Sequence, residues 1–326
     1  MPKILVTGGA GFIGAYLVNK LSKEKKNKIF VIDNLKTKGA VPFISNNNKF
    51  LKGDITEQKI LKKIEKWKPE IIFHLAAQSG SEGAYDSPKS DLVTNGFGTY
   101  LLAKLAKKIN CKKFIYTSTV AVYGSKKRTI NEKSNIEPDS IYGISKYCGE
   151  LYILQLLKYS KVKTYIFRVF NTYGPGEDLN NQKKGMVSIF LSYLWKKKPI
   201  IVKGSLNRFR NFIYIDDCVN FLYASLKNKK LKKFEVFNLT SQKKYSVLQL
   251  IKKIVKNYKI KNYKIKVKKG TKGDSFGFHS SNSYLRKKFP KIKFTPLEEG
   301  LKKYVDWVKS LPNNSNLKNL HPLNDI

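Results

Sequence analysis

The feature that most constrains the fold of this chain is a glycine-rich turn at residues 7–14, Thr-Gly-Gly-Ala-Gly-Phe-Ile-Gly. It follows a short apolar run at residues 4–6 and leads directly into apolar residues with helical spacing. A strand that reverses through such a turn into a helix directs backbone N–H groups and the positive helix end at one point. Glycine lets an anion approach that point closely. The turn therefore predicts a phosphate-binding site.

The first half of the chain repeats this alternation of short apolar runs and helical segments. Runs rich in β-branched and aromatic residues predict buried strands at residues 4–6, 29–32, 71–75, 114–116 and 165–169. Between them, pairs such as Leu17 and Leu21, or Ile60 and Ile64, have the spacing of one apolar helix face. We therefore predict an α/β fold, with a Rossmann-type doubly wound parallel sheet.

The glycines of the turn form a variant of the dinucleotide-binding fingerprint, G-x-x-G-x-x-G, at Gly8, Gly11 and Gly14. Asp33 ends the next predicted strand, where a carboxylate accepts hydrogen bonds from an adenosine ribose. A carboxylate there also repels a 2′-phosphate, so NAD is the predicted cofactor. Nearby lysines, Lys36 and Lys38, keep NADP open as an alternative.

Asp54 has two interpretations. It could contact the adenine of the cofactor, and with Glu57 it also has the spacing of a helix capping box. Both interpretations can hold together.

The alternation loosens after about residue 171, which predicts a smaller, discontinuous C-terminal lobe that binds substrate. We assign residues 1–171 to an NAD-binding Rossmann domain, to which the chain returns at about 205–240 through strands at 212–215 and 234–239. Residues 172–204 and 241–311 form the substrate-binding lobe, and residues 312–326 form a polar tail. Within the lobe, Thr295, Pro296 and Glu298 predict a helix start with a capping box.

A second group of residues carries acid–base chemistry. Tyr142 and Lys146 share one face if residues 142–158 are helical, and Thr119 lies upstream at the end of a predicted strand. A nearby ammonium and a cationic nicotinamide would stabilise the phenolate and lower the tyrosine pKa, which makes it a usable base. The spacing alone also fits an ordinary surface tyrosine and lysine on an amphipathic helix.

Composition narrows the classes of partner. The formal charge is +41, but 59 of the 64 basic residues are lysines scattered over the chain, whereas nucleic-acid recognition favours arginine. We predict no nucleic-acid partner. Cys111, Cys148 and Cys218 form no C-x-x-C pair, which argues against a zinc site or a disulfide scaffold and suits the cytoplasm. No apolar run approaches the roughly 20 residues of a membrane-spanning helix, so no membrane association and no metal are predicted.

Together these features resemble the NAD-dependent nucleotide-sugar epimerase/dehydratase family of the extended short-chain dehydrogenase/reductase superfamily. The order of motifs along nearly the whole chain carries the resemblance: residues 7–14, 31–35, 53–54, 74–78, Asn95, 98–99, Thr119, Tyr142 with Lys146, 168–174 and 210–217.

The resemblance implies roles for individual residues. Tyr142 would be the general base, Lys146 would hold the nicotinamide ribose, and Thr119 would hydrogen-bond the 4-oxygen of the sugar. Asn95 and His74 are interpreted as structural. The implied cofactor-binding residues are Gly8, Gly11, Phe12, Ile13, Gly14, Asp33, Asn34, Asp54, Ile55, Leu75, Ala76, Ala77, Tyr142 and Lys146, and the implied substrate-binding residues are Thr119, Tyr142, Asn171, Arg210 and Lys272.

Departures from the family pattern guide the choice of reaction. Dehydratases and decarboxylating relatives usually carry an acid just after the catalytic Ser/Thr, where this chain has Val120 and Ala121. We therefore predict a nucleotide-sugar 4-epimerase with a reaction similar to that of UDP-glucose 4-epimerase, on a UDP-hexose. Asn211 replaces a common aspartate, and Lys272 stands near the position of a second arginine. These two departures leave the nucleotide and the sugar open.

Two alternatives remain at this stage. The first is a 4,6-dehydratase or an NAD(P)H-dependent 4-keto-sugar reductase acting on a similar substrate. The second is a non-catalytic, NAD-sensing protein that keeps only the nucleotide-binding fold. The resemblance further implies a homodimer formed through two helices around residues 92–109 and 142–158.

Overall fold

The computed structural model describes residues 1–36, 48–125, 129–270 and 275–312. Its centre is a seven-stranded, entirely parallel sheet with the order β10-β6-β5-β4-β1-β2-β3. The strands are β1 (Lys3–Thr7), β2 (Lys28–Asp33), β3 (Asn48–Lys52), β4 (Ile71–His74), β5 (Lys113–Thr119), β6 (Lys163–Val169) and β10 (Phe234–Leu239). The predicted α/β fold with a doubly wound sheet is confirmed.

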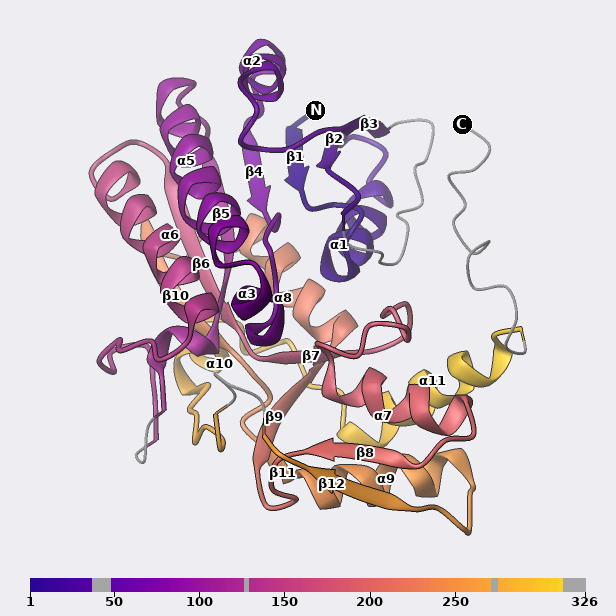
Figure 1. Ribbon diagram of the computed structural model, residues 1–326. Coiled ribbons are helices and arrows are strands. Elements are labelled where there is room, and N and C mark those ends of the chain that lie inside the picture. The colour runs from indigo at the N-terminus through magenta and orange to yellow at the C-terminus, as the bar shows by residue number, and fades with distance from the viewer. Residues whose placement is uncertain (37–47, 126–128, 271–274, 313–326) are drawn as a thin grey trace.

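Helices cover both faces of this sheet (Figure 1). One face packs against α2 (Gln58–Trp67), α5 (Thr99–Lys108) and α6 (Ile141–Leu157), which contribute Ile64, Leu102 and Ile153 to one core cluster. The other face packs against α1 (Phe12–Ser22) and α8 (Ile215–Lys227), whose Leu17 and Phe221 belong to a second cluster. Each predicted apolar helix face therefore points into a core.

The edge strand β3 was not predicted. Its five residues, from Asn48 to Lys52, include two lysines and are only partly buried at best, so they lack the apolar run of a buried strand. Pairing with β2 supplies the backbone hydrogen bonds that make it a strand.

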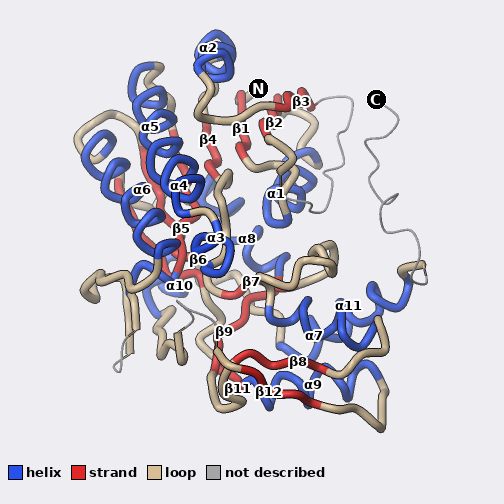
Figure 2. The backbone as a smooth tube through the Cα atoms, in the orientation of Figure 1, coloured by secondary structure: helices blue, strands red, loops and turns tan. Residues whose placement is uncertain are grey.

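The rest of the chain forms two small sheets and further helices (Figure 2). A three-stranded sheet has the order β11-β9-β7, and β12 pairs in parallel with β8. The elements are β7 (Asn171–Tyr173), β8 (Ile200–Lys203), β9 (Phe209–Tyr214), β11 (Lys244–Ser246), β12 (Ile265–Lys268), α7 (Met186–Trp195), α9 (Val247–Tyr258), α10 (Ser283–Lys288) and α11 (Leu297–Ser310).

Two local predictions in this region are wrong. The predicted strand at 212–215 does not join the central sheet, because β10 occupies the edge beside β6 and β9 pairs instead with β7 and β11. Thr295 does not cap α11, because Asp217 takes its backbone N–H at 2.6 Å and its hydroxyl at 2.9 Å. Pro296 is the residue that precedes the helix.

In the described part of the chain, no helix combines the length and the apolar character needed to cross a bilayer. Residues 313–326 of the predicted tail lie outside the described residues.

Candidate active site

A cavity of about 580 Å³ lies at the carboxyl ends of the central strands, with walls from the sheet and from the small lobe. Every predicted site residue within the described ranges lines it: Gly8, Gly11, Phe12, Ile13, Gly14, Asp33, Asn34, Asp54, Ile55, Leu75, Ala76, Ala77, Thr119, Tyr142, Lys146, Asn171 and Arg210. Lys272 lies outside the described residues. Residues distributed over two hundred positions of sequence thus face one space, large enough for an elongated ligand.

The glycine turn forms one end of this cavity. Gly8 adopts a φ of 70°, which disfavours other residues, and a Cβ on it would lie 2.5 Å from the backbone nitrogen of Ala76. A Cβ on Gly14 would lie 2.0 Å from the carbonyl oxygen of Gly8. The absence of side chains lets β1, the turn and α1 pack closely and leaves the helix N-terminus facing the cavity, as an anion site requires.

Asp33 stands at the end of β2 beside this turn. Its Oδ2 accepts the N–H of Ala10 at 3.0 Å, and its Oδ1 accepts the N–H of Leu35 at 2.8 Å. Burial raises its pKa, and the backbone hydrogen bonds oppose that rise. Because a carboxylate has about four acceptor positions, Asp33 can bind further hydroxyl donors from the cavity.

Asp54 contacts two neighbours in the cavity wall. Asn34 Nδ2 donates to its Oδ2 at 2.9 Å, and Lys36 Nζ lies 3.6 Å from the same oxygen. The capping-box interpretation holds only in part: Glu57 accepts the N–H of Asp54, but the Asp54 carboxylate accepts the N–H of Thr56 instead of that of Glu57. Helix α2 begins at Gln58.

The acid–base group lies where β5 ends and α6 begins. Ser140 caps α6 by accepting the N–H of Gly143 at 3.1 Å, which places Tyr142 in the first helical turn. The Tyr142 side chain faces the same cavity as Thr119, and Thr119 acts to lower the pKa of Tyr142. Thr119 in turn accepts the N–H of Ala121 at 3.3 Å, at the start of the 3₁₀ helix η2 (Val120–Tyr123). The three predicted catalytic side chains therefore come together.

Burial dominates the electrostatics of this group. Burial and the Asp91 carboxylate raise the pKa of Tyr142, and Thr119 opposes them. Burial lowers the pKa of Lys146 to about 7, against the opposing effects of Glu150 and Asp91. In the chain alone, burial and Asp91 therefore outweigh the contribution of Thr119, and the lowering of the Tyr142 pKa by a bound nicotinamide stays a prediction.

The two residues interpreted as structural, His74 and Asn95, each have two polar contacts within the fold. His74 is fully buried, with Nδ1 2.8 Å from Thr7 Oγ1 and Nε2 2.9 Å from Thr99 Oγ1. Asn95 lies in the π-helix η1 (Leu92–Gly98), and its Nδ2 is 2.9 Å from the Gln78 carbonyl and 3.0 Å from Ser145 Oγ. The contact with Ser145 supports α6 between the two catalytic positions of that helix.

The opposite wall of the cavity includes Asn171 on β7 and Arg210 on β9. Asn171 donates to the carbonyl of Asn211 at 3.0 Å, and Arg210 donates to the carbonyls of Phe209 at 2.8 Å and Ser275 at 2.8 Å. Burial lowers the pKa of Arg210 to about 10, and the charge of Arg208 adds to the effect. Contact of Asn171 and Arg210 with a substrate diphosphate stays a prediction.

Several cavity residues were missed. Lys203 and Arg208 add positive charge to the wall, and Glu82 adds a carboxylate. Arg208 could have been predicted from the sequence. It directly precedes β9 and stands two positions before Arg210, and residues two positions apart in an extended chain face the same side. Lys203 and Glu82 carry no sequence signal, since 121 positions separate them.

Comparison with known proteins identifies the family of this chain. Residues 4–240 match the family model described as NAD dependent epimerase/dehydratase family. The chain belongs to this family. The match covers well over half of the chain, and it confirms the resemblance and the prediction of an NAD-dependent enzyme.

Similar proteins include both epimerases and dehydratases. A putative UDP-glucose 4-epimerase from Methanocaldococcus jannaschii is 31% identical over 314 residues, which covers 94% of this chain and 98% of that protein. The dTDP-D-glucose 4,6-dehydratase of Homo sapiens is 29% identical over 334 residues, covering 98% and 92%. A crystal structure of UDP-glucuronic acid 4-epimerase from Bacillus cereus, in complex with UDP-glucuronic acid and NAD, is 27% identical with a TM-score of 0.86 and covers 94% and 99%.

Metal ligands do not cluster in the described ranges: no group of three or more His, Cys, Asp or Glu side chains there could hold a metal ion.

Proposed function

We propose that this family member is a nucleotide-sugar 4-epimerase that acts on a UDP-hexose with bound NAD. The observation that carries the proposal is that Thr119, Tyr142 and Lys146 line one cavity, while Val120 and Ala121 follow Thr119 where an acid would be expected. The similarity to epimerases over nearly the whole chain supports it.

The residues of the cavity fit NAD. The glycine turn packs tightly on the start of α1, so that a Cβ at Gly14 would collide with the Gly8 carbonyl oxygen, and Gly8, Gly11 and Gly14 line the cavity. Asp33 keeps acceptor capacity for ribose hydroxyls. Residues that would hold the cofactor are Gly8, Gly11, Phe12, Ile13, Gly14, Asp33, Asn34, Asp54, Ile55, Leu75, Ala76, Ala77, Tyr142 and Lys146. A bound NAD would supply the hydride acceptor and donor for a substrate carbon.

The chain's own residues supply the proton chemistry. Tyr142 takes the proton from the 4-hydroxyl as general base and returns it after the sugar has turned. Thr119, which lines the same cavity, orients the 4-oxygen through its hydroxyl. Lys146 stabilises the Tyr142 phenolate when it is protonated.

We assign substrate recognition to the small lobe, residues 172–204 and 241–311, and cofactor binding to residues 1–171 with the return at 205–240. Asn171, Arg208 and Arg210 lie outside these lobe ranges but face the same cavity as Lys203 of the lobe, and an amide with several cations suits a diphosphate. Lys272 belongs to the same proposal.

The test is a substrate panel. The purified protein is incubated with UDP-glucose, UDP-N-acetylglucosamine, UDP-glucuronic acid and their galacto counterparts, and the products are separated by chromatography. A 4-inverted product without net change in NAD is expected from at least one of them. Absence of an inverted product from all six would refute the proposal.

A dehydratase is the second candidate, because the human dTDP-D-glucose 4,6-dehydratase is similar over nearly its whole length. The same panel, extended with dTDP-glucose, separates the two. Formation of a 4-keto-6-deoxy sugar, detected by loss of water in mass spectrometry, would replace the epimerase proposal. Net consumption of NADH or NADPH would select a reductase, and NAD binding without any turnover would select the sensor.

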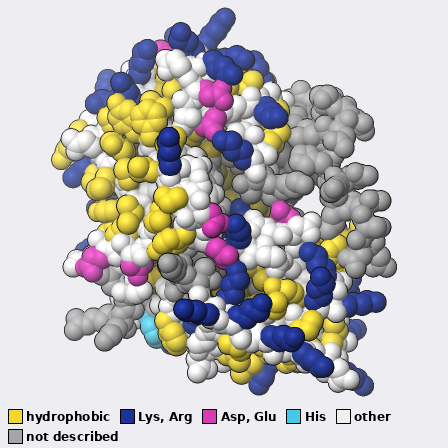
Figure 3. All heavy atoms as spheres, viewed as in Figure 1, with side chains coloured by type: hydrophobic (Ala, Val, Ile, Leu, Met, Phe, Trp, Pro, Cys, Tyr) yellow, Lys and Arg dark blue, Asp and Glu magenta, His cyan; other side chains and the backbone are white. Residues whose placement is uncertain are grey.

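We further propose that the protein is a homodimer through the helical segment 92–109, which comprises η1 and α5, and through α6. Apolar side chains gather on the face of these helices in Figure 3. The exposed ones include Leu92, Phe97, Ile144, Leu151 and Tyr152, each between 41% and 54% exposed. A contiguous apolar face of this kind marks an interface. Light scattering should give twice the chain mass, and Leu151→Lys should reduce it; a monomeric wild type would contradict the dimer.

The working compartment is proposed to be the cytoplasm. Cys111 and Cys218 are buried free thiols, and Cys148 is also free. Free thiols suit a reducing compartment. Fractionation of the producing cells, with immunodetection of the protein, tests this assignment.

A further inference from the structure

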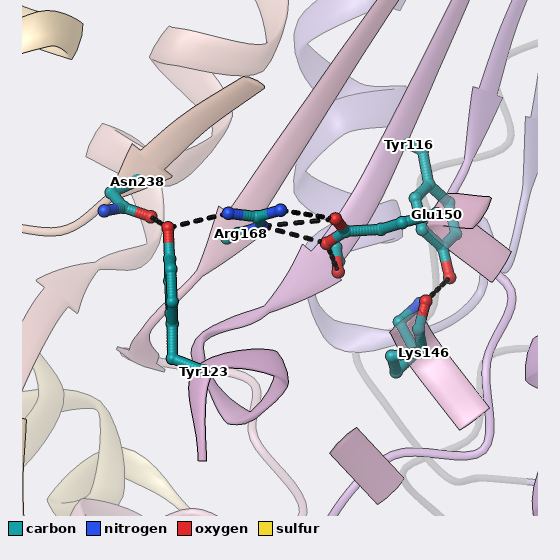
Figure 4. A network of polar contacts seen from close by, with 7 residues as sticks. Tyr116, Tyr123, Lys146, Glu150, Arg168 and Asn238 are labelled. Atoms are coloured by element: carbon teal, nitrogen blue, oxygen red, sulfur yellow. Dashed lines mark hydrogen bonds and ion pairs between the residues drawn. The ribbon is translucent and has the colours of Figure 1, made fainter. Parts of the chain in front are cut away.

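A buried ion pair connects the elements that carry the acid–base group (Figure 4). Glu150 on α6 and Arg168 on β6 are 4% and 5% exposed, and Arg168 donates from Nη2 at 2.7 Å and from Nε at 3.0 Å. Glu150 Oε1 also accepts the Ser118 hydroxyl at 2.5 Å. The Glu150 carboxylate therefore connects α6 with β6, through Arg168, and with the end of β5, through Ser118.

Arg168 connects the ion pair to two further residues, Tyr123 and Asn238. Arg168 Nη1 donates to the Tyr123 hydroxyl at 2.8 Å, and that hydroxyl donates to Asn238 Oδ1 at 2.7 Å. Tyr123 ends the 3₁₀ helix η2, which starts directly after Thr119. The segment that presents Thr119 is thus held on one side through Ser118 and on the other through Tyr123.

The glutamate side reaches the catalytic lysine. Glu150 follows Lys146 by one helical turn, so both side chains lie on the face of α6 that packs against β5. Lys146 Nζ lies 4.1 Å from the ring centre of Tyr116, which is two residues before Ser118 and on the same side of the strand. A Cβ on Gly149 would lie 2.7 Å from the Tyr116 hydroxyl, so glycine permits this close packing.

We propose that Glu150 and Arg168 are a positioning pair, which fixes the end of β5 and its Thr119 against the face of α6 that carries Tyr142 and Lys146. The inference rests on the proposed function, because it assigns these two residues a part in that reaction. A pair with a purely structural role would stabilise the fold without affecting the reacting groups.

The geometry has an electrostatic consequence that distinguishes the two roles. The groups around Lys146 are Glu150 on its own helix, Asp91 from α4 (Pro88–Asp91), His74 from β4 and Tyr116 from β5. The charges of Glu150 and Asp91 raise the pKa of Lys146, while burial lowers it to about 7. Removing the charge of Glu150 should lower that pKa further.

Four variants separate position from charge. Ser118→Ala removes one hydrogen bond and no charge, and should lower kcat about three- to tenfold. Glu150→Gln keeps the shape and removes the charge, and should lower kcat by about a hundredfold. Because Glu150→Gln leaves a buried arginine unpaired, the double variant Glu150→Met with Arg168→Met replaces the pair by apolar side chains that can fold. Glu235→Gln is the matched control, because the buried Glu235 of β10 pairs with the half-buried Lys288 of α10 away from the cavity.

The readouts are circular dichroism for folding, kcat and KM, and the pH dependence of NAD affinity by calorimetry. For Glu150→Gln, the midpoint of NAD affinity and the alkaline limb of kcat/KM should both move to lower pH, whereas Ser118→Ala and Glu235→Gln should leave them in place. The double variant should fold, keep its KM within about threefold and lose kcat.

Wild-type kcat from a folded double variant, or an unmoved midpoint of NAD affinity in folded Glu150→Gln, would overturn the inference. The NAD titration needs no turnover, so it tests the pair even if no sugar is epimerised. A wild type that turns over no substrate would refute the proposed function instead.

Discussion

Lys203 on β8 and Glu82 on α3 (Ser81–Asp86) form an ion pair that joins the two walls of the cavity, with Nζ 2.8 Å from Oε1 and 3.0 Å from Oε2. Lys184 Nζ donates to Ser79 Oγ at 2.9 Å beside it, and Lys183 pairs with Asp86. These contacts link the small lobe to the segment that follows β4.

The pair should affect substrate affinity more than stability. Lys203 and Glu82 side chains are 43% and 27% exposed, so either neutral substitution should change the free energy of unfolding by less than about 1 kcal/mol. Glu82→Gln frees the Lys203 ammonium for an anionic substrate and should lower KM a few-fold, while Lys203→Met should raise it. Steady-state kinetics and urea unfolding check both. Equal shifts of KM in the same direction would contradict the proposed competition.

Tyr142→Phe should abolish most of the turnover. The change removes the phenol hydroxyl and leaves the ring in the cavity wall. A general acid–base group contributes about 10²–10⁴-fold, so kcat should fall by that factor while NAD affinity stays within about threefold. Product chromatography and NAD titration measure the two effects. Tyr159→Phe, at an 83% exposed tyrosine on the surface, is the control and should behave as wild type.

Glu177 should make stability fall as the pH rises. Burial raises its pKa from 4.5 to about 8, against hydrogen bonds with Tyr304 and Ser188. The native state then holds a proton that the unfolded state has lost between these values, so the contribution of Glu177 is fully present below about pH 4.5 and is lost as the pH rises through 8. Urea unfolding of the cofactor-free protein at pH 5 and pH 8.5 measures it. Glu177→Gln should remove this part of the pH dependence; an unchanged slope would contradict the prediction.

Gly14→Ala should damage both stability and cofactor binding. The new Cβ would lie 2.0 Å from the Gly8 carbonyl oxygen and 2.7 Å from Gly9 Cα, which are backbone atoms that cannot rotate away. Overpacking of this kind costs about 1–3 kcal/mol, and the displaced turn should weaken NAD binding at least tenfold. Gly11→Ala is the comparison, because its Cβ would meet only the Gly8 oxygen at 3.3 Å. Equal losses of stability in the two variants would argue against the packing explanation.

Much of the fold and of the cavity wall could be predicted because local patterns specify them. The apolar runs of β1, β2, β4, β5 and β6 are short and continuous, as buried parallel strands require. The glycine turn and Asp33 are separated by one βα unit, so their proximity follows from the connectivity of such units. Tyr142 and Lys146 share a helix face for the same local reason.

Features that depend on distant partners were missed. Strand β3 is defined by its pairing with β2 and by no apolar run of its own. The capping of α11 depended on which donor Asp217 accepts, and Asp217 precedes Thr295 by 78 positions. The position of Glu150 beside Lys146 could have been predicted, because it follows Lys146 by one helical turn. Its pairing with Arg168 could not, because that pairing depends on β6 lying beside β5.

Strand β10 has a consequence for how the protein can be made. Its residues 234–239 cover the edge of β6, stack Phe237 on Phe167 with ring centres 5.1 Å apart, and bring Asn238 to Tyr123. A nascent chain that has emerged only to residue 171 therefore presents β6 as an open edge with an uncovered aromatic side chain, the kind of surface that chaperones bind and that aggregates. The central sheet is complete only after nearly three quarters of the chain has left the ribosome, because β10 is its edge strand. The shortest fragment able to fold as the cofactor-binding half must therefore extend beyond residue 239.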